Sequence, residues 1–435
     1  MKYFDFFFIK SNLLQKGQNL FLIALFFLPS TLLIGIIFLI PAAIIGSKLN
    51  KQKYFEDKIN IGFFTCGLFI TVSALLQKFV LVNQYSEIWD SNLTLIGLAN
   101  WIPFFWIFWA IQPYLESKKQ RERTAKIIIF GTFPVLVSGF GQYFFNWTGP
   151  WEILNGLIVW YQKPIENPAG LSGLFSNQNY AGSWLNFVWP FSIALTLTRS
   201  KNLIRKIFTI NFLAAIGFAT FLTNSRNAWS GLLFAVPIVI GYESFIWLVP
   251  LLVIVFFLIM ICTAKFLNGD FQDYVRSLIP DKIWLEFSKE GFKEIDVSRI
   301  EIFLSALMLI IKNPLFGIGA ASFPAIYYLQ TSFWKGHSHN LILEFTISYG
   351  VPSTIILLST IIAIMFVSGN SIFLNSANKN LNYFDRAWWS AAFFFMISQL
   401  VDIQYFDGKI AILFWILMAG LRNLSFKKEN CEKYI

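Results

Sequence analysis

The stretch from Leu20 to Gly46 reads LFLIALFFLPSTLLIGIIFLIPAAIIG and contains no charged residue. A helix that crosses a bilayer needs about 20 mostly apolar residues. This run is therefore too long for one relaxed span and too short for two full ones. Pro29 and Ser30 lie near its middle, where they can form a turn. The run predicts membrane insertion, either as one long span or as two short spans that turn at Pro29-Ser30.

The whole chain is also rich in apolar residues and poor in charged ones. Of its 435 residues, 56% are hydrophobic and only 13% are charged, whereas soluble domains average about 25% charged residues. The composition excludes a soluble enzyme, a secreted disulfide scaffold and a disordered chain, and it predicts an all-α polytopic membrane protein. The net charge of +10 indicates Lys and Arg beside anionic headgroups. The three scattered cysteines predict neither a disulfide nor a metal cluster.

Further apolar segments follow the first run. They cover residues 59–82, 93–111, 125–145, 183–198, 207–222, 227–241, 244–262, 341–367, 387–402 and 409–422. We expect a single integral membrane domain over residues 1–435, with residues 263–340 as one large loop outside the membrane. Residues 299–311 of this loop are apolar but too short to span, and they predict an interfacial helix. Ser298 and Glu301 form a capping-box pattern at its start, and Lys312-Asn-Pro314 predicts its end.

The distribution of Lys and Arg predicts the orientation. The basic loops are 47–58, 113–126, 199–206 and the tail after Leu424, whereas the loops 83–92 and 146–182 contain a single Lys. Positively charged loops stay in the cytoplasm, so loop 263–340 lies outside. Lys2, Lys10 and Lys16 lie inside only if the first run makes two spans. We therefore predict about twelve transmembrane helices with both termini in the cytoplasm.

Two arginines on the outer side are candidate ligands. Arg226 lies in the turn Thr223-Asn-Ser-Arg-Asn227, and a charge this near the membrane is costly unless it is paired or faces a wet cavity. Arg299 takes the first position of the predicted interfacial helix, where a guanidinium and free backbone N–H groups together suit a phosphate. Binding to lipid headgroups is the alternative for both.

The chain has two histidines, His337 and His339, in Gly-His-Ser-His-Asn340. Imidazole is the usual acid or base near neutral pH, although a structural role and a weak His-x-His metal pair remain alternatives. Asn177 and Asn179 precede an apolar segment and either cap it or hydrogen-bond a sugar. Gly317-Ile-Gly319 does not match a nucleotide-binding signature.

The order of these motifs resembles the O-antigen ligase and polymerase superfamily of bacterial envelopes. The motifs are GLFSNQN (173–179), LTNSR (222–226), NPLFGIG (313–319) and HSHN…YG (337–350), and the likeness covers residues 173–365. His339 and Gly350 match the His-x10-Gly pattern, so Gly350 joins Gly317 and Gly319 as motif glycines. Ser230 departs from the Leu that often stands there in ligases, which keeps the polymerase branch open.

The resemblance implies a multi-pass glycosyltransferase of the bacterial inner membrane, without metal or cofactor, whose site faces the periplasm. Its donor would be a glycan on undecaprenyl diphosphate, and its acceptor a hydroxyl of lipid A core, a glycan or a protein. Arg226 and Arg299 would hold the diphosphate, and His339 would orient or deprotonate the acceptor hydroxyl. Further substrate-binding residues would be His337, Asn177 and Asn179. No role with nucleic acid is expected.

Two other classes stay open from the sequence. One is a transporter or flippase for lipid-linked sugar, which would be expected to show internal repeats and midplane charges. The other is a structural assembly protein. Convergence of Arg226, Arg299 and His339 on one outer cavity would favour the enzyme. The sequence leaves the glycan, the acceptor and the oligomeric state open.

Overall fold

The computed structural model describes residues 2–50, 53–80, 88–166, 169–198, 202–264, 269–279, 299–374 and 382–426. Within these ranges the protein is mostly helical, as the composition predicts. The only sheet in the described ranges is a hairpin of β1 (Trp151–Ile153) and β2 (Ile158–Trp160), which pair antiparallel. The all-α fold class is therefore confirmed.

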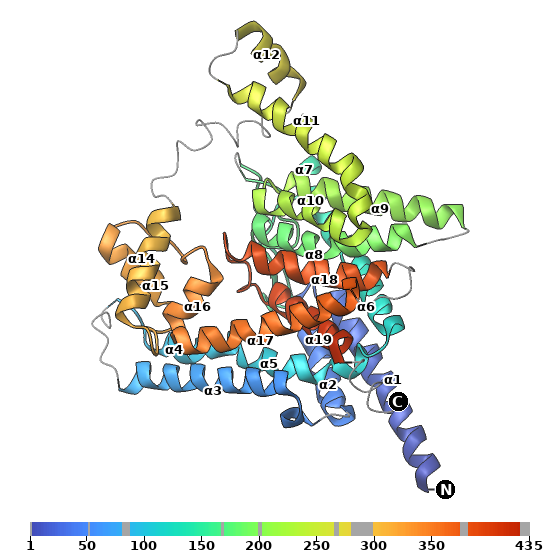
Figure 1. Cartoon of the computed structure of the whole chain (residues 1–435), viewed down its shortest axis with the longest axis vertical. Coiled ribbons are helices and arrows are strands. Elements are labelled where there is room, and N and C mark those ends of the chain that lie inside the picture. The colour runs from blue at the N-terminus through green and yellow to red at the C-terminus, as the bar shows by residue number, and fades with distance from the viewer. Residues whose placement is uncertain are drawn as a thin grey trace.

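Most of the helices lie side by side in a bundle, and α11 and α12 extend away from it (Figure 1). The N-terminal half contains α1 (Lys2–Phe27), α2 (Leu32–Leu49), α3 (Lys58–Phe79), α4 (Asn92–Gly97), α5 (Ile102–Ala110), α6 (Lys118–Gly131), α7 (Phe133–Phe145), α8 (Gln178–Leu197) and α9 (Leu203–Leu222). The C-terminal half contains α10 (Arg226–Ile240), α11 (Phe245–Thr263), α12 (Gly269–Leu278), α14 (Arg299–Lys312), α15 (Ser322–Thr331), α16 (Leu341–Tyr349), α17 (Val351–Gly369), α18 (Tyr383–Ser398) and α19 (Gly408–Phe426).

The first apolar run is divided between two helices. Helix α1 ends at Phe27 and α2 begins at Leu32, so the chain turns at Pro29-Ser30 and the two helices pack against each other. Proline favours this turn because it restricts the preceding residue and lacks an N–H for the helical ladder. Helix α1 also continues back to Lys2, so the first helix is longer than the short span expected from the run alone.

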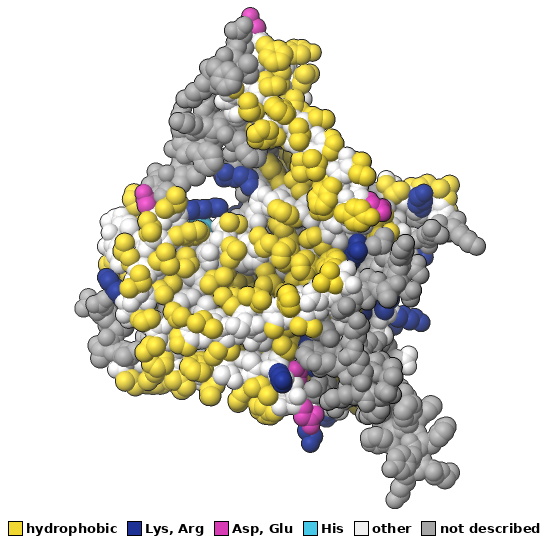
Figure 2. All heavy atoms as spheres, viewed as in Figure 1, with side chains coloured by type: hydrophobic (Ala, Val, Ile, Leu, Met, Phe, Trp, Pro, Cys, Tyr) yellow, Lys and Arg dark blue, Asp and Glu magenta, His cyan; other side chains and the backbone are white. Residues whose placement is uncertain are grey.

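Seven helical segments among the described residues are long and apolar enough to cross a membrane. They are Leu32–Leu49, Lys58–Phe79, Asn92–Ala110, Lys118–Phe145, Leu203–Leu222, Tyr242–Thr263 and Val351–Leu374. Figure 2 shows apolar side chains spread over the outer face of the bundle, where a soluble protein would carry charges. The chain is therefore a multi-pass membrane protein, and the count of twelve spans stays a prediction.

Three short helices, α14, α15 and α16, gather at one end of the bundle, beside α4 and the start of α17 (Figure 1). They share a small apolar core of their own, built from Ile302, Ala306, Leu309, Ile318, Phe323, Ile326, Tyr327 and Ile347. Among the described residues helix α14 covers Arg299–Lys312, and its end agrees with the predicted one. Ser298 of the expected capping box lies outside the described residues.

The expected span over residues 341–367 is not one helix. It is broken at Gly350, whose φ of 86° is outside the helical range, into α16 and α17. A Cβ at this position would lie 2.1 Å from the carbonyl oxygen of Leu315. The prediction of one continuous span was therefore wrong, because hydropathy does not register a backbone break between two apolar segments.

Candidate functional site

The two histidines lie in the loop between α15 and α16, whose backbone is fixed by its own side chains. The backbone N–H of His339 donates to Nδ1 of His337 (3.1 Å), and His339 itself has a left-handed φ of 54°. Asn340 then caps α16 by accepting from the N–H groups of Ile342 (2.9 Å) and Leu343 (3.1 Å). A left-handed conformation of a non-glycine residue costs free energy unless its surroundings impose it. Here the hydrogen bond to His337 and the cap formed by Asn340 supply that constraint.

The partner of His339 is Asp402, a residue that the sequence analysis missed. Nδ1 of His339 lies 3.0 Å from Oδ1 of Asp402. The other carboxylate oxygen, Oδ2, accepts from the side-chain amides of Asn179 (3.1 Å) and Gln404 (2.8 Å). Asp402 is thus held by α8, by the loop before α16 and by its own loop after α18.

Asp402 stands at the end of the apolar segment 387–402, which the sequence predicts to be a span. In the structure α18 ends at Ser398, and Asp402 lies in the loop that follows. A signal was present: a carboxylate at the end of an apolar segment is costly unless it has a partner.

The charges of this site can be assigned from its contacts. Burial raises the pKa of the Asp402 carboxyl, but the hydrogen bond with His339 and the charges of both imidazoles more than offset this effect, so its pKa lies below the ordinary value. An ionised Asp402 can only accept hydrogen bonds, so Nδ1 of His339 donates to it, and in the neutral form of the imidazole the lone pair is on Nε2.

His337 lies beside this pair. Its Nε2 is 4.0 Å from Oδ1 of Asp402, and its ring centroid is 4.4 Å from that of His339. Burial and the neighbouring charge of His339 lower the pKa of His337 to about 4, although Asp402 acts in the opposite direction. His337 is therefore neutral near pH 7.

The two predicted asparagines have different roles in the structure. Asn177 is the N-cap of α8, and its side chain accepts from the backbone N–H of Asn179 (2.7 Å). Helix capping, the default alternative, therefore describes Asn177. Asn179 instead uses its side chain to hold Asp402, which places it in the same cluster as the histidines.

Arg226 is the first residue of α10 and is exposed, and Ser225 caps the helix. The next residue, Asn227, donates to the carbonyl of Ser398 at the end of α18 (3.5 Å), four positions before Asp402. The start of α10 therefore lies beside the loop that contains Asp402.

Arg299 is exposed at the start of α14, and α14 packs against α16, the helix that follows the histidine loop. Figure 2 shows an opening in the face of the molecule toward the viewer, with basic side chains on both sides and a histidine at its edge.

The motif glycines connect loop 313–319 to α16, the helix that follows the histidine loop. Gly317 (φ 67°), Gly319 (φ 124°) and Gly350 (φ 86°) all have positive φ. Between them, the N–H of Ile318 donates to the carbonyl of Ile347 (2.7 Å). A Cβ at Gly317 would lie 2.4 Å from that same carbonyl oxygen. These glycines allow the close backbone approach that fixes α16 and, through it, the loop that precedes it.

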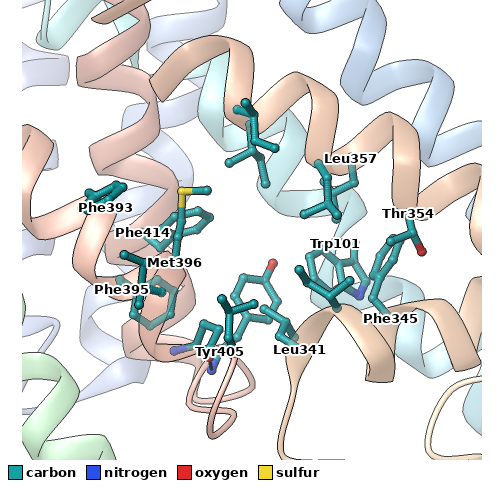
Figure 3. Close-up of a pocket in the computed structure, with 17 residues that line it drawn as sticks. Trp101, Leu341, Phe345, Thr354, Leu357, Phe393, Phe395, Met396, Tyr405 and Phe414 are labelled. Carbon is teal, nitrogen blue, oxygen red and sulfur yellow. Dashed lines mark hydrogen bonds between the residues drawn. The ribbon is translucent and has the colours of Figure 1, made fainter. Parts of the chain in front are cut away.

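An apolar cavity of about 240 Å³ lies next to the site, between α16, α17, α18 and α19. Figure 3 shows Leu357 and Met396 reaching into it from α17 and α18, with Trp101 and Phe345 at its side. Polar side chains on its wall already have partners. Thr354 donates to the carbonyl of Gly350 (2.9 Å), and Tyr405 donates to that of Asn100 (2.8 Å). The amide of Gln399 donates to Gln404 (2.9 Å). The cavity therefore suits a hydrocarbon.

The cluster of His337, His339 and Asp402 also has the composition of a metal site. Donor atoms of His337, His339 and Asp402 lie within 4.8 Å of one another, a grouping found among the described residues. Three protein ligands are the number that catalytic zinc sites use. The cluster can thus act as a hydrogen-bonded acid–base pair or as a ligand set, and a chelation experiment separates the two.

Fold and site together define a polytopic helical membrane protein with a His–Asp pair at one end of its bundle. Residues 210–358, from α9 into α17, match the O-antigen ligase family. This match agrees with the resemblance of the motifs and indicates membrane glycan biosynthesis of the ligase or polymerase type. The matched segment contains both arginines and both histidines but not Asp402. A comparison with curated proteins gives no match.

Proposed function

We propose that this chain is a membrane glycosyltransferase that moves a glycan from undecaprenyl diphosphate to an acceptor hydroxyl. It would act as an O-antigen ligase does in the biosynthesis of lipopolysaccharide or another surface polysaccharide. The observation that supports this best is the His339–Asp402 pair, with 3.0 Å between Nδ1 and Oδ1, in a chain whose residues 210–358 match the O-antigen ligase family. Because the basic loops predict the opposite side to be cytoplasmic, the site would face the periplasm from the bacterial inner membrane.

His339 would act as the general base. The acceptor oxygen attacks the anomeric carbon of the donor sugar, and its proton passes to Nε2 of His339. The bond between that carbon and the diphosphate oxygen breaks, which releases undecaprenyl diphosphate. Asp402 keeps the proton on Nδ1 and stabilises the imidazolium that forms. General base catalysis of this kind typically contributes about 10²–10⁴-fold to the rate.

The diphosphate leaving group needs positive charge, and Arg226 and Arg299 would supply it. A guanidinium is always charged and matches phosphate oxygens with two parallel N–H groups. Both arginines are exposed at helix N-termini, where the helix dipole adds to the attraction for an anion. With two arginines in this role, transfer would not require a metal.

The apolar cavity would hold part of the donor's hydrocarbon tail. At about 240 Å³ it has room for roughly eight groups the size of a water molecule, each about 30 Å³. That volume fits the first units of a polyprenyl chain rather than its whole length. Leu341 and Leu400 line the cavity and lie within two residues of His339 and Asp402, so a tail bound there would place its diphosphate near the base.

A polymerase of the same superfamily is the alternative, because it would use the same donor chemistry with a second glycan as acceptor. Ser230, which stands where ligases often have Leu, keeps this alternative open. Analysis of cell-surface glycolipids after deletion of the gene separates the two. A ligase defect leaves lipid A core without glycan, whereas a polymerase defect shortens the glycan chains.

The direct test uses purified protein in nanodiscs with a labelled, undecaprenyl-diphosphate-linked glycan. We expect His339→Ala to insert normally and to bind the donor but to lose most of the transfer, about 10²–10⁴-fold. His337→Ala should cost less, because His337 has no contact with Asp402 shorter than 4.0 Å. If His339→Ala transfers the glycan at the wild-type rate, the proposed role of His339 as the base is wrong.

A further inference from the structure

A second cavity, of about 420 Å³, has the side chain of Arg386 on its wall. This Arg386 cavity lies where the end of α10 and the turn Tyr242–Ser244 meet the start of α18 and the turn Asn370–Leu374. The opposite ends of the same two helices lie beside Arg226 and Asp402. At 1.5 Å per residue, α10 and α18 separate the Arg386 cavity from the candidate site by about 20 Å.

The contacts next to Arg386 indicate which side of the membrane this cavity faces. Asp385 accepts from Nε (3.0 Å) and from a terminal nitrogen (3.2 Å) of Arg121. Arg121 belongs to the basic loop 113–126, and positively charged loops stay in the cytoplasm. The Arg386 cavity therefore lies on the predicted cytoplasmic side, across the membrane from the histidines.

The guanidinium of Arg386 is half-buried, and the neighbouring carboxylate of Asp385 is already paired with Arg121. In the described part of the chain no hydrogen bond or ion pair of the Arg386 side chain is found. Its guanidinium lies 5.5 Å from the ring centroid of Phe373, and a Cβ at Gly241 would lie 3.2 Å from Nη1. A charge near the membrane is costly without a partner, and every N–H of a guanidinium can donate. The cavity therefore suits an anionic group.

A carboxylate lines the same cavity. Glu243 lies in the turn after α10 and is exposed, and among the described residues its side chain has neither a hydrogen bond nor an ion pair. Glu243 and Arg386 do not pair with each other. Free phosphate would match Arg386 but would be repelled by Glu243. A molecule that contains both a phosphate and an ammonium group matches both charges.

The rest of the wall is aromatic and aliphatic, and its residues are Pro237, Ile238, Ile240, Tyr242, Phe373 and Trp389. Aromatic faces attract ammonium groups, and Tyr and Trp gather at the headgroup level of a bilayer. The indole of Trp389 is fixed, because its N–H donates to the carbonyl of Met365 (2.9 Å). Leu233 and Phe234, further back on α10, are exposed apolar residues along which acyl chains can lie.

We propose that the Arg386 cavity binds the headgroup of a zwitterionic phospholipid from the cytoplasmic leaflet. The phosphate lies against Arg386, and the ammonium group lies against Glu243 and the aromatic rings. The lipid contacts both α10 and α18, which also pack against each other, so its binding stabilises the folded protein. This site is independent of the proposed glycan transfer, because it lies at the other end of both helices.

The measurement is lipid binding to the full-length protein in detergent by native mass spectrometry. The probes are phosphatidylethanolamine, phosphatidylglycerol with the same acyl chains, and the chain-free headgroup glycerophosphoethanolamine. We expect wild type to bind phosphatidylethanolamine about threefold more tightly than phosphatidylglycerol, since an exposed carboxylate contributes little to an ion pair. Glycerophosphoethanolamine should bind far more weakly than either lipid, because it has no chains to bury.

Two substitutions assign the charges, and a third is the control. Arg386→Gln should weaken the binding of both lipids about tenfold, the effect of losing a charged hydrogen-bond partner. It should also abolish the rise in melting temperature that phosphatidylethanolamine gives wild type. Glu243→Gln should remove only the preference for phosphatidylethanolamine. Arg123→Gln is the matched control, because Arg123 is exposed on α6 at the same predicted side and does not line the cavity.

The proposal is overturned if Arg386→Gln binds phosphatidylethanolamine as tightly as the Arg123→Gln control does. It is also overturned if wild type binds phosphatidylglycerol at least as tightly as phosphatidylethanolamine. Equal binding of glycerophosphoethanolamine and the lipid would assign the cavity to a soluble phosphate ester instead. Glu243 is exposed, so Glu243→Gln tests the site even if Arg386→Gln does not fold, and an unchanged lipid preference in Glu243→Gln would contradict the assignment.

Discussion

The substitution Asp402→Asn gives the sharpest test of the His–Asp pair, because the surrounding hydrogen bonds determine how the new amide must lie. Oδ2 of Asp402 accepts from Asn179 and Gln404. The orientation of Gln404 is itself fixed, since its carbonyl oxygen accepts from Gln399 (2.9 Å). An introduced NH2 group at the Oδ2 position would face two donors. Each buried donor left unsatisfied costs about 1–3 kcal/mol, so the amide carbonyl must take that position.

The NH2 group of the introduced amide then faces Nδ1 of His339. Nδ1 must accept a hydrogen bond, so the proton of the neutral imidazole moves to Nε2 and the base is lost. We expect kcat to fall about 10²–10⁴-fold, while KM for the donor and the thermal stability of the protein stay near their wild-type values. The assay is glycan transfer in nanodiscs under saturating donor. Asp90→Asn is the control. Asp90 is exposed, and its carboxylate accepts from the backbone N–H of Asn92 (2.9 Å), away from this site.

A double substitution separates this mechanism from a general loss of stability. If Asp402 acts only through His339, Asp402→Asn should cost nothing further in a His339→Ala background, because coupled residues are not additive. Transfer by Asp402→Asn within about threefold of wild type would refute the reasoning. The reasoning would also be refuted if the loss of transfer caused by Asp402→Asn added in full to the loss caused by His339→Ala.

Three further predictions concern the arginines, the metal and the topology. Arg226→Lys and Arg299→Lys should each lower kcat/KM for the donor about tenfold, because Lys lacks the planar fork, and wild-type turnover in either variant would argue against diphosphate recognition. Transfer by the purified protein should survive EDTA; loss of activity that a divalent ion restores would instead assign the histidines and Asp402 to a metal. Reporter fusions after Lys16 and after Lys428 should both report the cytoplasm, and reporters on opposite sides would contradict an even number of spans.

The sequence predicted those features that depend on neighbouring residues. The structure agrees with the division of the first run at Pro29-Ser30, the end of α14 at Lys312, the turn before Arg226 and the cap at Asn177. Helix starts, turns and apolar segments depend on residues within a few positions of one another. A single sequence therefore contains enough information to place them.

The tertiary structure alone decided which residues form the site. Asp402 is 63 positions after His339 and 223 positions after Asn179, yet it contacts both. The sequence predicted Asp402 at the end of a span. It also predicted one continuous span where the structure has α16 and α17, separated at Gly350. Hydropathy records how a segment partitions between water and lipid, and it has no term for hydrogen bonds between distant segments. Those bonds exist only once α8, α16 and α18 have packed, because packing brings Asn179, His339 and Asp402 to the same end of the bundle.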